Sequence, residues 1–231
     1  MANQPIAVAV LGAAGRMGRT TAAAVEAAPD MELVATVDPR LGGQTLEDAL
    51  ETADVVVDFT QPEAVLGNVR LAVKAGVHCV VGTTGFDQAE LERICAEGTG
   101  KVIAAPNFAV GAVLMMRFAQ EAAKVMAKAE VIELHHEAKV DAPSGTALRT
   151  AALIEAAAKK GPVPIHSVRL PGLVAHQEVV LGDLGQTLTI RHDTTSREAF
   201  MPGVLLAIRR VRGLDRSPVV GLEELLWPAA E

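Results

Sequence analysis

Short apolar runs alternate with longer segments of mixed polarity along the first half of the chain. Residues 6–11 form an uninterrupted apolar run between a proline and a glycine, which is typical of a buried parallel strand. Further strands are predicted at 31–37, 54–59, 77–81 and 101–105, and helices at 16–28, 45–53, 62–75 and 87–97. Strict alternation of strand and helix predicts an α/β fold with a Rossmann-like, doubly wound parallel sheet.

The second half predicts a smaller α+β domain. Helices are expected at 109–128 and 147–160, strands at 131–137, 165–170, 177–181 and 187–192, and a hairpin turn at 182–185. A last helix at 197–212 contains Pro202 and Gly203, which we expect to kink it. The four strands predict an open mixed sheet, and an exposed sheet face favours an oligomer.

Two domains follow from this pattern. Residues 1–106 and 199–231 are predicted to form a dinucleotide-binding domain, and residues 107–198 a substrate-binding and oligomerisation domain. The last helix is expected to return to the first domain.

Composition narrows the class of protein. A net charge of -7 argues against a nucleic-acid partner, and no apolar run approaches the length of a membrane helix. The start Met-Ala-Asn-Gln-Pro lacks the basic beginning of a signal peptide. Cys79 and Cys95 lack metal-ligand spacing and indicate buried, reduced thiols. We therefore expect a cytoplasmic protein with no metal site and no membrane partner.

A glycine-rich turn follows the first strand and opens the first helix. Its first glycine permits a tight bend, its second lets backbone N–H groups approach a pyrophosphate, and its third lets helix and strand pack closely. This context predicts a dinucleotide cofactor. The turn consists of Gly12, Ala13, Ala14, Gly15, Arg16, Met17 and Gly18.

The second strand ends at an acidic residue about 20 positions past the turn. Asp38 is placed to hold the ribose hydroxyls of the cofactor and alone would favour NADH. Arg16 and Arg40 are candidates to hold a 2′-phosphate, which would favour NADPH. The sequence leaves the choice between the two cofactors open.

Polar or glycine-rich turns follow the third, fourth and fifth strands. Ligands of doubly wound sheets bind at the carboxyl ends of the strands, so we expect these turns to contact the cofactor. The candidate residues are Phe59, Thr60, Gly82, Thr83, Thr84, Ala105, Pro106, Asn107 and Phe108.

Residues that can donate a proton or bind an anion are concentrated between positions 133 and 146. His135 and His136 fall in a predicted strand, where neighbours point to opposite faces, so only one is expected to face a given ligand. Lys139 could add a positive charge. Ser144, Gly145 and Thr146 begin a predicted helix, with Ser144 as its N-cap, and offer donors suited to a carboxylate.

Taken together, these motifs make the chain resemble the 4-hydroxy-tetrahydrodipicolinate reductase (dihydrodipicolinate reductase) family over nearly its whole length. The resemblance implies NADH- or NADPH-dependent reduction of a cyclic imine dicarboxylate to tetrahydrodipicolinate in diaminopimelate and lysine biosynthesis. It implies His135 and Lys139 as catalytic residues, and His136 with Ser144, Gly145 and Thr146 as the substrate's carboxylate site. It also implies a homotetramer joined through the sheets of the second domain.

Two other interpretations of the function remain open from the residues alone. Another two-domain nicotinamide oxidoreductase would share the first domain, although neither cysteine has the cationic setting that an aldehyde dehydrogenase needs. A regulator that binds NADH without turnover would need the first domain but not the cluster of His135, His136 and Lys139. The presence of that cluster therefore distinguishes a reductase from a regulator.

Overall fold

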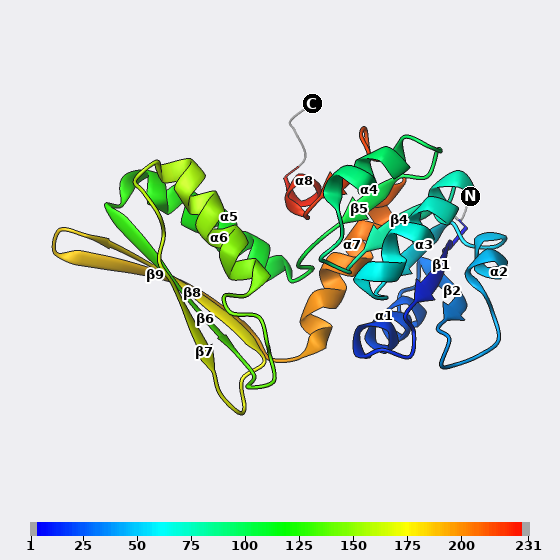
Figure 1. The fold of residues 1–231 in the computed structure, drawn as a ribbon, viewed down its shortest axis with the longest axis horizontal. Helices are drawn as coiled ribbons and strands as arrows, with labels where there is room; N and C mark the ends of the chain where they lie inside the picture. The colour runs from blue at the N-terminus through cyan, green and yellow to red at the C-terminus, as the bar shows by residue number, and fades with distance from the viewer. Residues whose placement is uncertain (1–3, 228–231) are drawn as a thin grey trace. The chain divides into compact units, whose positions relative to one another are not determined.

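The computed structural model describes residues 4–227 and divides the chain into two compact units (Figure 1). Unit 1 comprises Met1–Phe108 and Phe200–Glu231, and unit 2 comprises Ala109–Ala199. The first three residues of the segment considered for a signal peptide lie outside the described residues. No helix between residues 4 and 227 is long and apolar enough to cross a membrane.

Unit 1 is built on a six-stranded parallel sheet, which confirms the predicted Rossmann-like class. The strand order is β10-β5-β4-β3-β1-β2. Every residue of β3 is buried, as expected for a strand covered on both faces. The strands are β1 (Ile6–Leu11), β2 (Met31–Val37), β3 (Val55–Asp58), β4 (His78–Val81), β5 (Val102–Ala104) and β10 (Val219–Val220).

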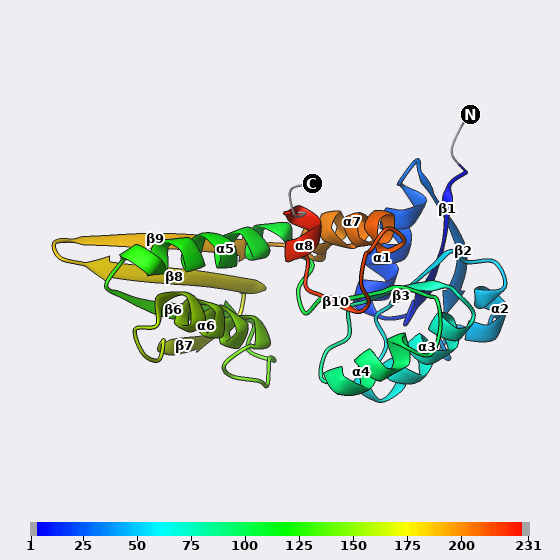
Figure 2. The ribbon, with the colours of Figure 1, turned by 90° about the horizontal axis from the view of Figure 1, so that it is seen from above.

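Helices cover both faces of this sheet (Figure 2). The first group is α1 (Arg16–Glu26) and α7 (Met201–Val211), which pack against each other. The second is α2 (Leu46–Leu50), α3 (Pro62–Lys74) and α4 (Gln88–Cys95). On the second side, Val65 and Val69 of α3 and Leu91 and Ile94 of α4 are buried against the sheet. A short helix, α8 (Glu223–Leu226), follows β10.

Unit 2 is a four-stranded mixed sheet with two long helices, as the sequence predicts. The strand order is β7-β6-β8-β9, with β6 parallel to β7 and antiparallel to β8. Its elements are α5 (Val110–Val125), β6 (Lys128–His135), α6 (Gly145–Ala158), β7 (Ile165–Arg169), β8 (Ala175–Asp183) and β9 (Gln186–Thr194). Both helices pack on the face that carries the buried residues Val131, Glu133, Val179 and Leu181.

The opposite face of this sheet, called the open face below, carries the alternate residues of the strands. Ile132 and Leu134 are half-buried there, whereas Glu130 and His166 are exposed and pair at 2.8 Å. A hairpin with Gly185 at φ 73° joins β8 to β9. The open face is consistent with the sheet expected from sequence.

The structure corrects the predicted bounds of one helix and one strand, and the predicted kink in the last helix. The helix predicted at 109–128 ends at Val125, and the strand predicted at 131–137 begins at Lys128 and ends at His135. His136 therefore lies beyond the strand, and strand alternation does not govern it. Pro202 occupies the first turn of α7 after a 3-10 turn, so it begins the helix and does not kink it, because the first turn needs no N–H from proline.

Candidate active site

The glycine-rich turn has the geometry that a dinucleotide requires. Gly12 has φ +71°, and a Cβ there would lie 2.6 Å from the carbonyl oxygen of Phe59. A Cβ on Gly18 would lie 2.2 Å from the carbonyl oxygen of Gly12, so helix and strand approach closely. Gly15 is the N-cap of α1 and has no side chain to cover the helix N-terminus. Backbone N–H groups at this end can therefore bind a phosphate.

A cavity of about 460 Å³ opens beside this turn. The predicted residues that line it come from the ends of β1, β2 and β3, the edge where ligands of such sheets bind. They are Gly12, Gly15, Asp38, Arg40, Phe59 and Thr60. Ala13 and Ala14 line a neighbouring hollow together with Arg19. The residues present thus fit a nicotinamide dinucleotide.

Asp38 and Arg40, which both line the cavity, form a bidentate ion pair. Arg40 donates from Nε to Asp38 Oδ1 at 3.0 Å and from Nη2 to Oδ2 at 2.9 Å. Asp38 also accepts from the Ala14 N–H at 3.1 Å. Hydrogen bonds from Arg40 hold the pKa of the Asp38 carboxyl well below its usual range. The residue predicted to accept from a ribose hydroxyl and the candidate cation for a 2′-phosphate are therefore in contact with each other.

The buried carboxylate of Asp58, to which the sequence analysis assigned no role of its own, holds the next turn. Asp58 accepts from the Thr60 N–H at 2.8 Å and the Thr60 hydroxyl at 2.6 Å, and Asn68 donates to it at 2.8 Å. Burial raises the pKa of Asp58, and these hydrogen bonds oppose the rise. The network fixes the backbone that presents Phe59 and Thr60 to the cavity.

The other predicted turn residues lie outside the lining of this cavity. The Thr83 hydroxyl donates to the carbonyl of Thr60 at 3.2 Å, which joins two of the turns. Phe59 and Phe108 meet edge to face, with ring centroids 6.1 Å apart. The residues outside the lining are Gly82, Thr83, Thr84, Ala105, Pro106, Asn107 and Phe108.

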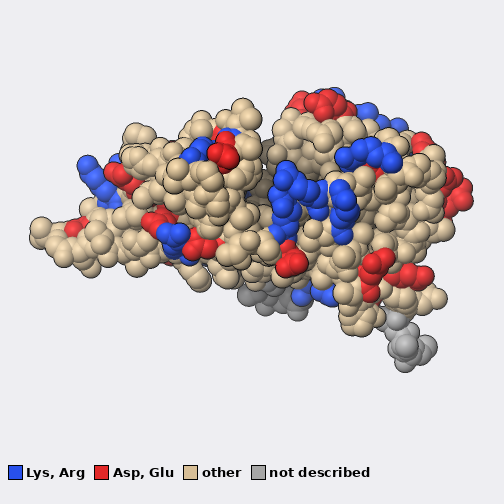
Figure 3. All heavy atoms as spheres, turned by 90° about the horizontal axis from the view of Figure 1, so that it is seen from below, with Lys and Arg blue, Asp and Glu red and all other residues tan. Residues whose placement is uncertain are grey.

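Basic side chains are concentrated on part of unit 1. On the face drawn in Figure 3, Lys and Arg gather on unit 1, although the chain as a whole has a net charge of -7. Arg16 and Arg19 of α1 are both exposed. Their charge adds to that of the helix N-terminus and favours an anionic ligand in unit 1. Met17 lies between them and is half-buried.

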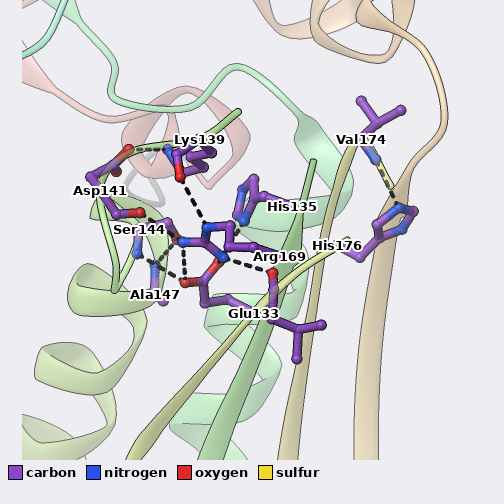
Figure 4. A network of polar contacts seen from close by, with 10 residues as sticks. Glu133, His135, Lys139, Asp141, Ser144, Ala147, Arg169, Val174 and His176 are labelled. Carbon is purple, nitrogen blue, oxygen red and sulfur yellow. Dashed lines mark hydrogen bonds and ion pairs between the residues drawn. The ribbon is translucent and has the colours of Figure 1, made fainter. Parts of the chain in front are cut away.

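In unit 2, a histidine, a carboxylate and an arginine form one hydrogen-bonded chain (Figure 4). Glu133 and His135 are two residues apart on β6 and point to the same face. His135 Nδ1 lies 2.5 Å from Glu133 Oε2. Arg169, at the end of β7, donates to both oxygens of Glu133 at 2.9 and 2.7 Å. Among residues 4–227, His135 hydrogen-bonds through Nδ1 and not through Nε2.

The charges of this cluster act on each other. Burial alone would raise the pKa of Glu133, but hydrogen bonds from Arg169, Ser167 and His135 outweigh it and lower the pKa. Burial lowers the pKa of His135, Glu133 opposes this, and the positive charges of Lys139 and Arg169 add to the lowering. Glu133 is thus ionised at neutral pH, and His135 titrates below its ordinary value of 6.5.

Lys139 and the start of α6 complete the cluster. Lys139 Nζ donates to Asp141 Oδ1 at 2.7 Å, and the Lys139 side chain is 23% exposed. Ser144 caps α6 as predicted, because its hydroxyl accepts from the Ala147 N–H at 3.2 Å. The N-terminus of an α-helix carries a partial positive charge, so this end of α6 is suited to an anion. Gly145 and Thr146 begin the helix.

The structure brings together most, but not all, of the residues predicted for this site. His135, Lys139 and Ser144 belong to one network through Glu133, Arg169 and Asp141 (Figure 4). The ring of His136 makes no hydrogen bond with any residue between 4 and 227. Glu133 and Arg169 were not assigned roles from sequence. Glu133 could have been found from the sequence, because residues two apart on a strand point to the same face and Glu133 lies two residues before His135. Arg169 could not, because its position depends on the register in which β7 pairs with β6.

Comparison with known proteins matches both parts of the chain to one family. A family model described as dihydrodipicolinate reductase, N-terminus, matches residues 6–108. A second, described as dihydrodipicolinate reductase, C-terminus, matches residues 111–226. The two models together cover almost all of the described chain.

Relatives and solved structures agree with these matches. A 4-hydroxy-tetrahydrodipicolinate reductase of Nocardia farcinica is 49% identical, covering 96% of this chain and 98% of its own. One from Syntrophomonas wolfei is 44% identical, covering 97% and 100%. A dipicolinate-bound dihydrodipicolinate reductase from Paenisporosarcina has 36% identity and a TM-score of 0.86, covering 96% of this chain and 99% of that one.

Proposed function

Because the chain belongs to the dihydrodipicolinate reductase family, we propose that the two sites serve that family's reaction. The protein is an NAD(P)H-dependent oxidoreductase that reduces 4-hydroxy-tetrahydrodipicolinate to tetrahydrodipicolinate, with loss of water, in diaminopimelate and lysine biosynthesis. The observation that supports the site assignment most is the network of His135, Lys139 and the start of α6.

Unit 1 holds the cofactor. The turn from Gly12 to Gly18 binds the pyrophosphate, and Asp38 with Arg40 meets the adenosine ribose or its 2′-phosphate. The turns containing Phe59, Thr60, Gly82, Thr83, Thr84 and residues 105–108 bind toward the nicotinamide. When bound, NADH or NADPH would supply a hydride to carbon 4 of the substrate ring, once the 4-hydroxyl group has left as water.

Unit 2 supplies the proton and binds the substrate's charges. His135 Nε2 delivers a proton to the ring position made electron-rich by reduction, because a protonated imidazole can act as a general acid. Lys139 exchanges Asp141 for the substrate and stabilises negative charge. The N–H groups of Gly145 and Thr146 and the Ser144 hydroxyl bind a carboxylate. His136, which extends from the end of β6, binds beside them.

The proposal also covers the oligomeric state of the protein and the compartment in which it acts. We assign the open face of the unit 2 sheet to contact with a copy of itself, giving a homotetramer that acts in the cytoplasm. Support comes from the half-buried Ile132 and Leu134 on a face that neither α5 nor α6 covers. Light scattering of the purified protein tests the tetramer, and a monomer at micromolar concentration would rule it out.

The test of function follows absorbance of the reduced nicotinamide. Substrate is made fresh from pyruvate and aspartate semialdehyde by the upstream synthase, and NADH and NADPH are supplied in separate runs. We expect signal loss only in the complete mixture. His135→Gln should lower kcat by about 10²–10⁴-fold and leave NADH affinity unchanged. Full activity of that variant would refute the role of His135, and bound NADH without turnover would identify a regulator.

A further inference from the structure

Glu133 is a carboxylate with no exposure to solvent. Its side chain is 0% exposed, on the face of the unit 2 sheet that α5 and α6 cover. A buried charge is stable only when it is paired and hydrogen-bonded. Here the charge partner is Arg169, and the Ser144 N–H also donates to Glu133 at 3.3 Å. Stability alone would be served as well by an apolar residue, so the retained charge suggests a role in the site.

Arg169 is fixed as firmly as Glu133. Besides its two bonds to Glu133, it donates to the carbonyls of Val168 at 2.8 Å, Asp141 at 2.7 Å and Lys139 at 3.3 Å. All five N–H groups of its guanidinium are therefore engaged. Arg169 ties the loop that carries Lys139 to the carboxylate that contacts His135. The two parallel bonds from Arg169 restrict the orientation of the Glu133 carboxylate.

We propose that Glu133 and Arg169 are positioning residues for His135, which deepens the proposed function and rests on it. Glu133 accepts the Nδ1–H of His135 and so fixes the ring and its tautomer. With that proton held at Nδ1, the proton that His135 gives and regains is the one at Nε2. Arg169 keeps Glu133 ionised and oriented, so that Glu133 accepts a hydrogen bond and does not take the proton.

The two residues have opposite electrostatic effects on His135. The negative charge of Glu133 favours the protonated imidazole, whereas the positive charge of Arg169 disfavours it. Lys139 acts in the same direction as Arg169 and is partly offset by its partner Asp141. Loss of Glu133 and loss of Arg169 should therefore move the titration of His135 in opposite directions.

The experiment compares Glu133→Gln and Arg169→Gln in the whole chain, with Glu121→Gln as the control. Glu121 lies on α5 of the same unit and pairs with Lys124, and about half of each side chain is exposed. We expect Glu133→Gln to lower kcat by about 10–100-fold, with KM for NADH unchanged. The alkaline limb of kcat should move to lower pH in Glu133→Gln and to higher pH in Arg169→Gln. Glu121→Gln should match the wild type.

A direct measurement needs no variant. In ¹⁵N spectra of the wild-type protein, neutral His135 should be present as the Nδ1–H tautomer. An Nε2–H tautomer, or wild-type kcat and pH profile in Glu133→Gln, would overturn the proposal. A wild-type enzyme that fails to oxidise NADH or NADPH in the complete mixture would instead refute the proposed function, so the two failures are distinguishable.

Discussion

Gly82 leaves room for the ring of Phe59, which lines the cavity beside the glycine-rich turn, and replacing Gly82 by alanine should destabilise the fold. A Cβ at this position would lie 2.1 Å from Phe59 Cε1 and 2.6 Å from Cδ1, where ordinary contacts begin at 3.4 Å. The ring would have to move by more than 1 Å. The ring contacts Phe108 edge to face, and the backbone of Phe59 is held by its N–H, which donates to the Leu11 carbonyl at 3.2 Å. We expect Gly82→Ala to destabilise unit 1 by about 1–3 kcal/mol, the usual cost of overpacking.

Gly67 provides a matched control in the same unit. It lies in the interior of α3, exposed, and a Cβ there would meet nothing within 4 Å. Gly67→Ala should stabilise unit 1 by about 0.5–1 kcal/mol, because glycine in a helix costs conformational entropy. The same chemical change is thus expected to act with opposite signs at the two positions.

Urea unfolding followed by tryptophan fluorescence measures this difference. The chain has one tryptophan, Trp227, and it belongs to unit 1, as both glycines do. A probe in unit 1 is needed because a chain of two units need not unfold in one transition. The two variants should differ by about 1.5–4 kcal/mol, and Gly82→Ala should also bind NADH more weakly. Equal shifts of the two midpoints in the same direction would refute the steric argument.

Two further predictions concern the cofactor and the helix start. Arg40→Gln should lower kcat/KM for NADPH about 10-fold, which corresponds to the loss of one exposed charge-assisted contact. The kcat/KM for NADH should stay the same or rise, because Asp38 no longer pairs with Arg40. Equal losses of kcat/KM with both cofactors would contradict this prediction. Ser144→Ala should cost unit 2 about 0.5–2 kcal/mol through loss of the bond to Ala147 and raise KM for the substrate. The equivalent cap loss in unit 1, Thr45→Ala, should leave that KM unchanged, and a rise there would point to general destabilisation.

Local patterns were sufficient to predict most of unit 1. The apolar run ending at Leu11 and the glycine at position 12 are adjacent in sequence, so the strand and the turn with positive φ could both be inferred. The cap at Ser144 was predicted for the same reason. Strand β10 could not be, because two residues carry no periodicity and owe their place to pairing with β5.

The arrangement around His135 was only partly predictable. The residues of the cluster lie close in sequence, and alternation along β6 places Glu133 beside His135. Arg169 is distant in sequence, and its position depends on the register in which β7 pairs with β6. No local pattern fixes that register. In the same way, the boundary of β6 depends on pairing with β8, which extends over Lys128–His135 and excludes His136.

The insertion of unit 2 within unit 1 has a consequence for synthesis on the ribosome. Unit 2 is one continuous segment and can fold as soon as Ala199 has emerged, because its strands and helices are then all present. Unit 1 has to wait. Until α7 and β10 are made, β5 has an unpaired edge and α1 lacks the helix that packs against it. The part of the protein that begins first is therefore completed last, and its exposed strand edge is the surface that chaperones would have to protect during translation.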